Sequence, residues 1–494
     1  MDFLRIRYSK CLDFLRKIYK YLIIWKLCIN FALMYLNRII DRYLSDWANR
    51  SLHKPVLLRG ARQVGKSTAV RHLGESFDNF IEINFERQPE YMEIFRNNLV
   101  APRITAEISA LSGIPVQPGK TLLFLDEIQM CPEAIMSLRF FKEELPELHV
   151  IAAGSLLEFA LAELPTFGVG RIHSMFMYPM TFDEFLEATG NKPLIDARDN
   201  ASFDNPLSEP LHTKLIELLR TYMIVGGMPE VVATWIKTND YLQCQEIQED
   251  LLISYEDDFP KYKKKIDPHL LRLTFRSAAV QATHKFVYSE VGSGYRPEEV
   301  KKALDMLILA GLVIPVTRSD ASGFPLGASA NDKYRKMLLL DPGLLLRMLN
   351  MQTGESREMD THILTATVAE LVNKGPMAEL IAGLEMIRYA SPNIRHELYY
   401  WMRPAKNSQA EVDYVTPFES KILPIEVKAG TRGGMKSLWL FMGVKHLSTA
   451  VRMSLENFGK FQYEDSDTEA RYNVLCLPLY AVSMMSTQLP TLNS

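Results

Sequence analysis

The sequence has few cysteines, and they are not arranged to bond to one another or to a metal. Its 494 residues include only five, spread along the chain without a Cys-x-x-Cys pair or a cluster with histidine: Cys11, Cys28, Cys131, Cys244 and Cys476. This spacing argues against a disulfide framework and against a zinc site. We therefore expect a reducing, cytoplasmic location.

An excess of charge of one sign is also missing. The formal net charge is −3, with 47% hydrophobic and 23% charged residues, a composition typical of globular proteins. No basic field covers the whole chain, so contact with nucleic acid would have to come from local patches. A chain of this length has room for about three domains of ordinary size.

A long apolar run without charges is missing too. The nearest to one is the segment 21–36, which follows a basic stretch, but it is short for a bilayer and is interrupted by Lys26 and Asn30. We expect no integral membrane role. Residues 1–33 form an N-terminal extension with two interpretations: a start codon assigned upstream of Met34, or an interfacial amphipathic helix.

A phosphate-binding loop follows the first apolar strand. The pattern Gly-x-x-x-x-Gly-Lys-Ser comes directly after the strand-like segment 55–59 and leads into a helical segment. In this context the backbone N–H groups surround phosphate, Lys66 reaches the β- and γ-phosphates, and Ser67 offers its hydroxyl to Mg²⁺. The sequence therefore predicts that ATP and Mg²⁺ bind at a loop composed of Gly60, Ala61, Arg62, Gln63, Val64, Gly65, Lys66, Ser67 and Thr68.

Two acids follow a later strand. From the loop onward, strands and helices alternate, which predicts a parallel α/β sheet covered on both faces. The apolar run 121–125 ends in Asp126 and Glu127, the Walker B pattern. In that pattern Asp126 holds Mg²⁺ through water, and Glu127 orients and deprotonates the attacking water.

Two further polar residues follow in the same region. Ser155 comes after the strand 149–154 and is either a sensor of the γ-phosphate or an ordinary turn serine. Arg171 precedes the strand 172–178. It is either a cation that stabilises the transferring phosphoryl group, in the same chain or across a subunit contact, or a surface arginine.

These motifs together resemble one family. The chain from about Tyr35 to Tyr480 is similar to prokaryotic AAA-type ATPases that carry a C-terminal domain of unknown function. The resemblance rests on Leu125-Asp126-Glu127-Ile128-Gln129, Ala-Gly-Ser at 153–155, Gly-Arg at 170–171 and Tyr178-Pro179-Met180-Thr181-Phe182. It implies an AAA+ core with a 5-1-4-3-2 sheet, a nucleotide-hydrolysing site, and a restriction-endonuclease-like C-terminal domain.

The middle of the chain predicts a winged helix. A turn at 292–294 precedes a helix with apolar residues at helical spacing, and the segments 312–316 and 336–340 would form the two strands of a wing. The helix has a mixed rather than basic face, so DNA reading, packing and partner binding all stay open. Its charged residues are Lys301, Lys302, Glu298, Glu299 and Asp305.

The last third predicts a PD-(D/E)xK nuclease-like fold. Asp413 lies in one predicted strand, and Glu426 and Lys428 project from the same face of the next. Asp413 and Glu426 would hold Mg²⁺, Lys428 would activate water, and Glu379 on an upstream helix would complete the carboxylate set. The alternative is a half-exposed strand with an incidental Glu/Lys pair.

The predicted organisation has four parts: the extension, an AAA+ ATPase domain, a helical and winged-helix domain, and a nuclease-like domain. Their bounds are 1–33, 34–205, 206–345 and 346–494. The leading hypothesis is a Mg²⁺-dependent ATPase that drives a module acting on DNA. The alternative is a nucleotide-gated switch that binds DNA or a protein partner, with an inactive nuclease-like domain. A third hypothesis is a nuclease that ATP regulates and that depends on Asp413, Glu426 and Lys428. Self-association would supply an arginine in trans.

Overall fold

The structure is a computed structural model of the whole chain. It describes residues 35–155, 157–163, 170–262, 265–349, 375–403, 410–429, 434–465 and 469–492. The predicted extension 1–33 lies outside these residues. The chain divides into two units, 1–37 and 38–494, and all elements named here belong to the second.

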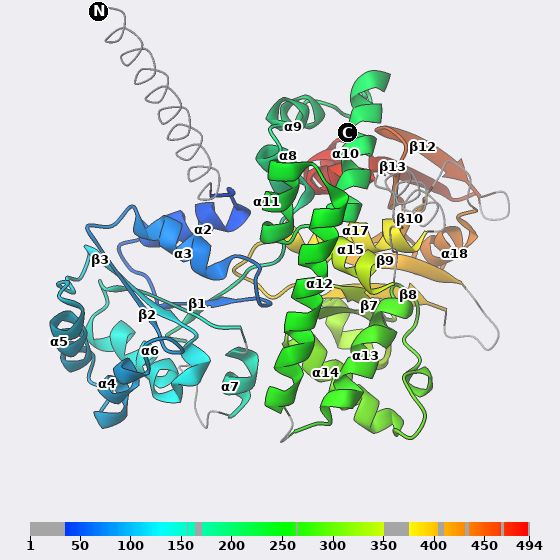
Figure 1. The fold of residues 1–494 in the computed structure, drawn as a ribbon. Coiled ribbons are helices and arrows are strands. Elements are labelled where there is room, and N and C mark those ends of the chain that lie inside the picture. The colour runs from blue at the N-terminus through cyan, green and yellow to red at the C-terminus, as the bar shows by residue number, and fades with distance from the viewer. Residues whose placement is uncertain are drawn as a thin grey trace, which may run out of the picture. The chain divides into compact units, whose positions relative to one another are not determined.

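A five-stranded parallel sheet lies in the N-terminal part of this unit (Figure 1). Its strand order is β2-β3-β4-β1-β5, which confirms the order that the family resemblance implied. β3 is buried along its whole length, as expected for a central parallel strand. The strands are β1 (Val56–Arg59), β2 (Asn79–Asn84), β3 (Thr121–Asp126), β4 (His149–Ala153) and β5 (His173–Phe176).

Helices cover this sheet. Leu123 and Leu125 of β3 pack into a core with apolar residues of α4, α5 and α6, while α3 contacts β3 and β4. Two short 3₁₀ turns, η1 (Pro89–Tyr91) and η2 (Ile128–Met130), join these elements. The helices are α2 (Ile39–Ala48), α3 (Lys66–Gly74), α4 (Met92–Asn97), α5 (Ala101–Ser112), α6 (Pro132–Glu144) and α7 (Leu157–Glu163).

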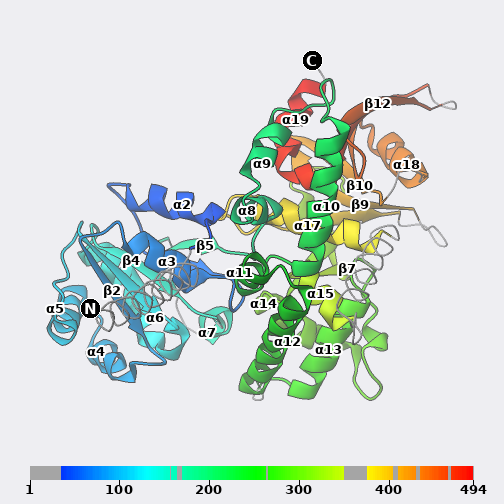
Figure 2. The ribbon, with the colours of Figure 1, turned by 45° about the horizontal axis from the view of Figure 1, so that its top comes forward.

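A helical region follows the sheet (Figure 2). Its first helix starts at a capping box, because the Thr181 hydroxyl accepts from Glu184 N and the Glu184 carboxylate accepts from Thr181 N. The helices are α8 (Phe182–Ala188), α9 (Lys192–Asp199), α10 (Glu209–Val225), α11 (Pro229–Thr238), α12 (Tyr241–Asp258), α13 (Pro268–Val280), α14 (Pro297–Leu309) and α15 (Pro342–Met348), with η3 (Phe259–Tyr262) and η4 (Tyr288–Glu290) between them.

The two predicted wing strands pair as an antiparallel hairpin. They are β6 (Val313–Ser319) and β7 (Ala330–Leu339), joined through η5 (Leu326–Ser329). β6 also pairs in parallel with β8 (Leu398–Met402), so the hairpin is part of a larger sheet. Strands from both sides of residue 345, where the sequence predicted a domain boundary, therefore belong to one hydrogen-bonded sheet.

That larger sheet has eight strands in the order β12-β13-β11-β10-β9-β8-β6-β7. Helices α17 and α18 pack against it. Its other strands are β9 (Glu411–Phe418), β10 (Lys421–Val427), β11 (Thr449–Ser454), β12 (Gly459–Glu464) and β13 (Arg471–Pro478). The helical elements of this part are α17 (Pro376–Arg388), α18 (Lys436–Lys445), η6 (Leu479–Met484) and α19 (Met485–Leu492).

The described part of the chain contains no helix with both the length and the apolar character needed to span a bilayer. Three of the five cysteines fall in the described residues, where all three are free and buried: Cys131, Cys244 and Cys476. The other two, Cys11 and Cys28, lie outside them.

A buried arginine connects α17 to segments that are distant in the sequence. Arg388 of α17 donates to the carbonyl oxygens of Met180 (3.0 Å) and Leu340 (2.7 Å) and forms an ion pair with Glu385 (3.3 Å). The Asp341 carboxylate lies 3.8 Å away. All the charged groups in this set are buried, so the guanidinium compensates acids that have no access to water.

The acids in this set fasten backbone from other elements. Glu385 accepts from Phe182 N (3.0 Å), at the start of α8, and Asp341 accepts from Gly227 N (2.6 Å), in the turn before α11. Burial raises the pKa of Glu385 to about 7, although the Arg388 charge opposes this shift. Four separate segments are thus held by one buried ionic network.

Replacing Arg388 with methionine should destabilise the fold strongly. Arg388→Met keeps most of the side-chain volume but leaves buried acids uncompensated, a change that costs about 3–5 kcal/mol in comparable sites. We expect the midpoint of thermal unfolding to fall by several degrees. The matched control is Arg296→Met, because the Arg296 side chain is 82% exposed. Equal midpoints for the two variants would contradict the role given to Arg388.

Candidate functional site

The phosphate-binding loop requires two of its glycines. Gly60 and Gly65 have φ angles of +149° and +100°, which residues with a side chain rarely adopt. A Cβ on Gly60 would lie 2.1 Å from the carbonyl oxygen of Met177, and one on Gly65 would lie 3.3 Å from the Arg38 guanidinium. The loop leads into α3, whose amino end faces the loop and favours an anion.

Lys66 is held inside the loop. Its side chain is 7% exposed, and its Nζ donates to the carbonyl oxygens of Gly60 (2.8 Å) and Ala61 (2.7 Å). Burial lowers the pKa of Lys66 to about 8, and the charges of Glu127 and Asp126 only partly oppose this. A phosphate would supply the negative charge that the two carbonyl groups lack.

Ser67 and Asp126 lie together, as the sequence predicted for a Mg²⁺ site. Ser67 Oγ donates to Asp126 Oδ2 at 3.0 Å, and Asn84 Nδ2 donates to the same oxygen at 3.2 Å. Burial raises the pKa of Asp126, with a further contribution from the Glu127 charge. A hydroxyl and a carboxylate oxygen at the end of a P-loop are the ligands that Mg²⁺ prefers, so these residues fit the ion.

Glu127 lies beside this pair with its carboxylate held in place. Gln129 Nε2 donates to Glu127 Oε2 at 2.5 Å, and Ser155 Oγ donates to the same oxygen at 3.3 Å. Glu127 has a φ of +48°, in the left-handed region, which turns the chain sharply as it leaves β3. Ser155 is therefore a neighbour of the predicted water-activating carboxylate, and not only a turn residue.

Three contributors to this site were not predicted. Asn84 pairs with Asp126 in the register of β2 and β3, and its place at a strand end next to the Walker B strand was a usable signal. Gln129 belongs to the motif that carried the resemblance. Arg38, which donates to Val64 O (2.8 Å) and Tyr178 O (2.6 Å), is distant in sequence and had no local signal.

The loop also contacts the helical region. Arg62 Nη1 pairs with both carboxylate oxygens of Asp258 at 3.0 and 2.8 Å, and Tyr255 Oη donates to Arg62 O at 3.1 Å. Both partners lie on α12. Gly311, in the turn between α14 and β6, also approaches the loop, since a Cβ there would lie 3.3 Å from Ala61 N.

Arg171 does not lie with the other predicted site residues. β1 and β5 are parallel, with Val56 opposite His173 and Arg59 opposite Phe176, and the phosphate-binding loop leaves from the Arg59 end. Arg171 precedes His173 and therefore lies at the opposite, amino-terminal edge of the sheet. Its side chain is 55% exposed and pairs with Glu143 at 3.1 Å. The predicted role within the same chain is not supported by this position.

The C-terminal residues do converge. The antiparallel register of β9 and β10 pairs Tyr414 with Ile425 and so brings Asp413 opposite Glu426. Lys428 Nζ lies 2.6 Å from Glu426 Oε1, on the same face as predicted, and Asp413 Oδ2 accepts from Val427 N at 2.8 Å. Burial, followed by the Asp413 charge, raises the pKa of Glu426 to about 7.

A lysine that the sequence analysis missed lies within this cluster. Lys336 of β7 is 1% exposed, and its ammonium lies 2.7 Å from Glu379 Oε1 and pairs with Glu411. Burial would lower the pKa of Lys336, but Glu379, Glu411 and Asp413 together raise it, so the ammonium stays charged. Burial raises the pKa of Glu379 to about 8 despite the Lys336 charge.

This arrangement does not fit a metal ion. Mg²⁺ needs several oxygen ligands in a near-octahedral set. Here Glu379 is bonded to Lys336, one oxygen of Glu426 to Lys428, and one of Asp413 to a backbone N–H. The other oxygen of Glu426, Oε2, is buried and has no partner among the described residues. Across the described ranges, no group of three or more acidic, histidine or cysteine side chains is placed to hold a metal. The predicted metal role of Glu379, Asp413 and Glu426 is not supported.

Three family models match parts of the chain. The AAA domain matches residues 52–186, and two domains of unknown function, DUF8612 and DUF4143, match residues 216–355 and 374–480. Residues 52–186 are therefore an AAA-type P-loop domain, as the resemblance implied. The other two matches name no activity, so the winged-helix and nuclease-like assignments stay predictions.

Two solved structures show weak similarity. A Walker-type ATPase of Pyrococcus abyssi is 16% identical over 64% of this chain and 96% of its own, with a TM-score of 0.41. The Orc1 protein of Aeropyrum pernix, solved in complex with DNA, is 14% identical over 68% of this chain and 95% of its own, with a TM-score of 0.26. No curated protein matches the chain. Similarity at this level establishes neither substrate nor partner.

The buried position of Lys66 predicts that nucleotide affinity depends on pH. The pKa of Lys66 is lowered to about 8 in the free protein, and bound phosphates favour the charged form. Above pH 8 binding must therefore take up a proton, and affinity should fall by up to about tenfold per pH unit. The measurement is the Kd for MgATP between pH 7.5 and 9.5.

The control is Lys66→Arg, whose guanidinium stays charged over this range. Its affinity should lack the slope, whatever its absolute value. An equally flat profile for the wild type would show that Lys66 does not titrate on binding.

Proposed function

We propose that the protein is a Mg²⁺-dependent ATPase. The observation that carries this proposal is the position of the Glu127 carboxylate, held by Gln129 and Ser155 next to the Ser67–Asp126 pair and the buried Lys66. A loop that only bound nucleotide would not need an oriented carboxylate at this point. The match of residues 52–186 to the AAA domain supports the same conclusion.

Hydrolysis would be an in-line attack of water on the γ-phosphorus. Glu127 orients the water and takes its proton, while Lys66 compensates charge on the β- and γ-phosphates. Ser67 and Asp126 would hold Mg²⁺, which polarises the phosphates when bound. Ser155 and Gln129 fix the Glu127 carboxylate, so that it does not have to be ordered during the reaction.

We propose further that the nucleotide cycle is transmitted through Arg62. This loop residue is paired with Asp258 and hydrogen-bonded through its carbonyl to Tyr255. Phosphates in the loop would compete for the Arg62 guanidinium and so weaken its bond to α12. The helical region and the eight-stranded sheet would then respond to the nucleotide state.

Two substitutions test the ATPase proposal. Lys66→Ala should weaken MgATP binding and abolish hydrolysis, because the loop loses its buried cation. Glu127→Gln should keep MgATP binding within about threefold of wild type but lower kcat by about 100-fold or more, because general-base catalysis typically contributes 10²–10⁴-fold. The measurements are phosphate release and equilibrium binding. Turnover that survives both substitutions would disprove the assignment.

A second candidate function is a nucleotide-gated binding switch without nuclease activity. The specific observation in its favour is the Lys336 ammonium, which is bonded to Glu379 within the carboxylate cluster. The exposed lysines of α14 lie beside an exposed acid, Glu298, and favour no particular partner. In this view the C-terminal part binds DNA or a protein in a manner that depends on the nucleotide.

We therefore expect no metal-dependent cleavage of nucleic acid. The full chain would be incubated with single- and double-stranded DNA and Mg²⁺ or Mn²⁺, with ATP, with ADP and without nucleotide. Asp413→Asn is the control for a contaminating nuclease. Cleavage by the wild type that Asp413→Asn abolishes would overturn the switch and restore the nuclease hypothesis.

A further inference from the structure

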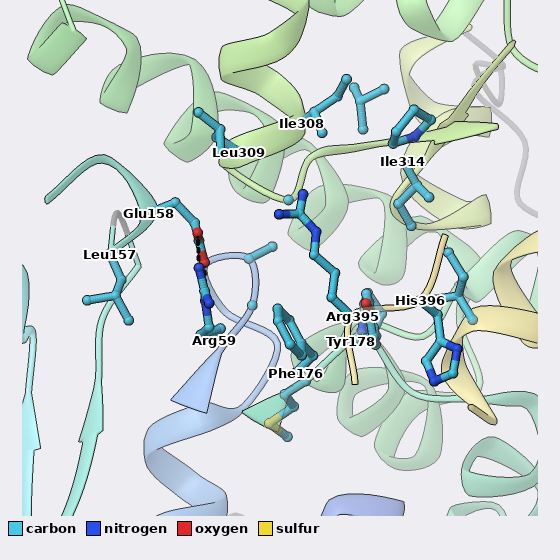
Figure 3. Close-up of a pocket in the computed structure, with 18 of the residues that line it drawn as sticks. Arg59, Leu157, Glu158, Phe176, Tyr178, Ile308, Leu309, Ile314, Arg395 and His396 are labelled. Carbon is cyan, nitrogen blue, oxygen red and sulfur yellow. Dashed lines mark hydrogen bonds and ion pairs between the residues drawn. The ribbon is translucent and has the colours of Figure 1, made fainter. Parts of the chain in front are cut away.

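A cavity of about 160 Å³ lies between the phosphate-binding loop and the C-terminal half (Figure 3). One wall comes from the ends of β1 and β4, with Gly60, Ala61 and Ser155. The opposite wall comes from the turn after α14 and from residues 395–397, which connect α17 to β8. The cavity therefore borders the residues that would surround the γ-phosphate.

Among the described residues, all but one of the charged side chains around this cavity have an ion-pair or hydrogen-bond partner. Arg59 forms an ion pair with Glu158, and Glu397 accepts a hydrogen bond from Tyr399. Burial lowers the pKa of His396, which keeps its ring neutral at neutral pH, and its buried Nε2 has no hydrogen-bond partner in the part of the chain that the structure describes. Arg395 also lines the cavity, and within the described residues its guanidinium has no hydrogen bond or ion pair. Figure 3 shows it extended between the loop and the end of α14.

The segment that carries Arg395 is fixed to the first sheet. Phe176 N donates to Pro392 O at 2.8 Å, and His173 Nε2 lies 2.8 Å from Asn393 Oδ1. Both partners belong to β5, which pairs with β1, the strand that leads into the loop. The Arg395 charge also acts on Tyr178, where it opposes the rise in pKa that burial causes. Arg395 thus has a set position relative to the loop.

We propose that Arg395 contacts the γ-phosphate of ATP bound in the same chain and acts as a catalytic residue. This inference rests on the proposed ATPase function. In the reaction, a bond forms between the water oxygen and the γ-phosphorus, and the bond to the β–γ bridging oxygen breaks. The proton passes to Glu127 and the electron pair leaves with ADP. Arg395 stabilises charge on the transferring phosphoryl oxygens through its planar set of N–H donors.

Arg395 meets this requirement better than Arg171 and Arg59 do. Arg171 lies at the far edge, and the charge of Arg59 is compensated by Glu158. The arginine also comes from the C-terminal half, so hydrolysis would require that half to be docked on β5. ATP hydrolysis would then occur only while the C-terminal half is in contact with β5.

The experiment measures kcat and MgATP affinity for Arg395→Ala and Arg395→Lys in the full chain. We expect Arg395→Ala to lower kcat about 100-fold or more, since such arginines contribute 10³–10⁵-fold in comparable enzymes. Affinity for MgADP should be unchanged. Arg395→Lys keeps the charge but not the planar donors and should fall between. Arg296→Ala, an exposed arginine at the other end of α14, should behave as wild type.

A mixing test separates action within the chain from action across chains. Arg395→Ala and Lys66→Ala protein, mixed in equal amounts, should show no more activity than the Arg395→Ala protein alone if Arg395 acts in its own chain. Recovered activity would overturn the proposal, as would a wild-type kcat for Arg395→Ala.

If wild-type turnover is too slow to compare with that of the variants, the measurement is the ratio of the affinities for a non-hydrolysable ATP analogue and for ADP. Arg395→Ala should lower this ratio, and an unchanged ratio would overturn the proposal. Wild-type protein that binds no nucleotide would disprove the proposed function itself, whereas a wild-type kcat in Arg395→Ala alone would disprove only this inference.

Discussion

The buried ion pairs of Arg388 connect parts of the chain that no local interaction would hold together. The arginine and the acids Glu385 and Asp341 have almost no contact with water, so each charge depends on the others for compensation. Through these acids the network fixes the start of α8 and the turn before α11. The position of α17 follows from this network, and with it the position of the segment that carries Arg395.

Two buried lysines illustrate how surroundings decide the role of a side chain. Within the described residues, Lys66 has only carbonyl acceptors at hydrogen-bonding distance, so burial dominates and lowers its pKa to about 8. Lys336 has Glu379 and Glu411 beside it, so its pKa is raised. The first is left ready for an anion, whereas the second already compensates the acids around it. Lys66 can therefore bind an anionic ligand, whereas the charge of Lys336 is already compensated by carboxylates.

Much of the nucleotide site could be predicted from the sequence, because its residues are close together in the chain or end neighbouring strands. The loop from Gly60 to Ser67 is one contiguous segment, and Asp126 and Glu127 follow a strand whose apolar character marked it as central. The order of the sheet followed from the family resemblance and is confirmed. Asn84 was predictable in principle from its place at the end of a strand.

The C-terminal site was different, because its decisive residue comes from another part of the fold. Sequence spacing correctly brought Glu426 and Lys428 to one face of a strand and predicted the helix that carries Glu379. It did not reveal Lys336, since pairing of β6 with β8 is a long-range contact without a local pattern. The local residue pattern was enough to predict the chemistry of the phosphate-binding loop, which depends on backbone conformations that glycine permits. Which charges meet became known from the folded chain alone, because Coulomb interactions depend on distance in space and on burial rather than on separation along the chain.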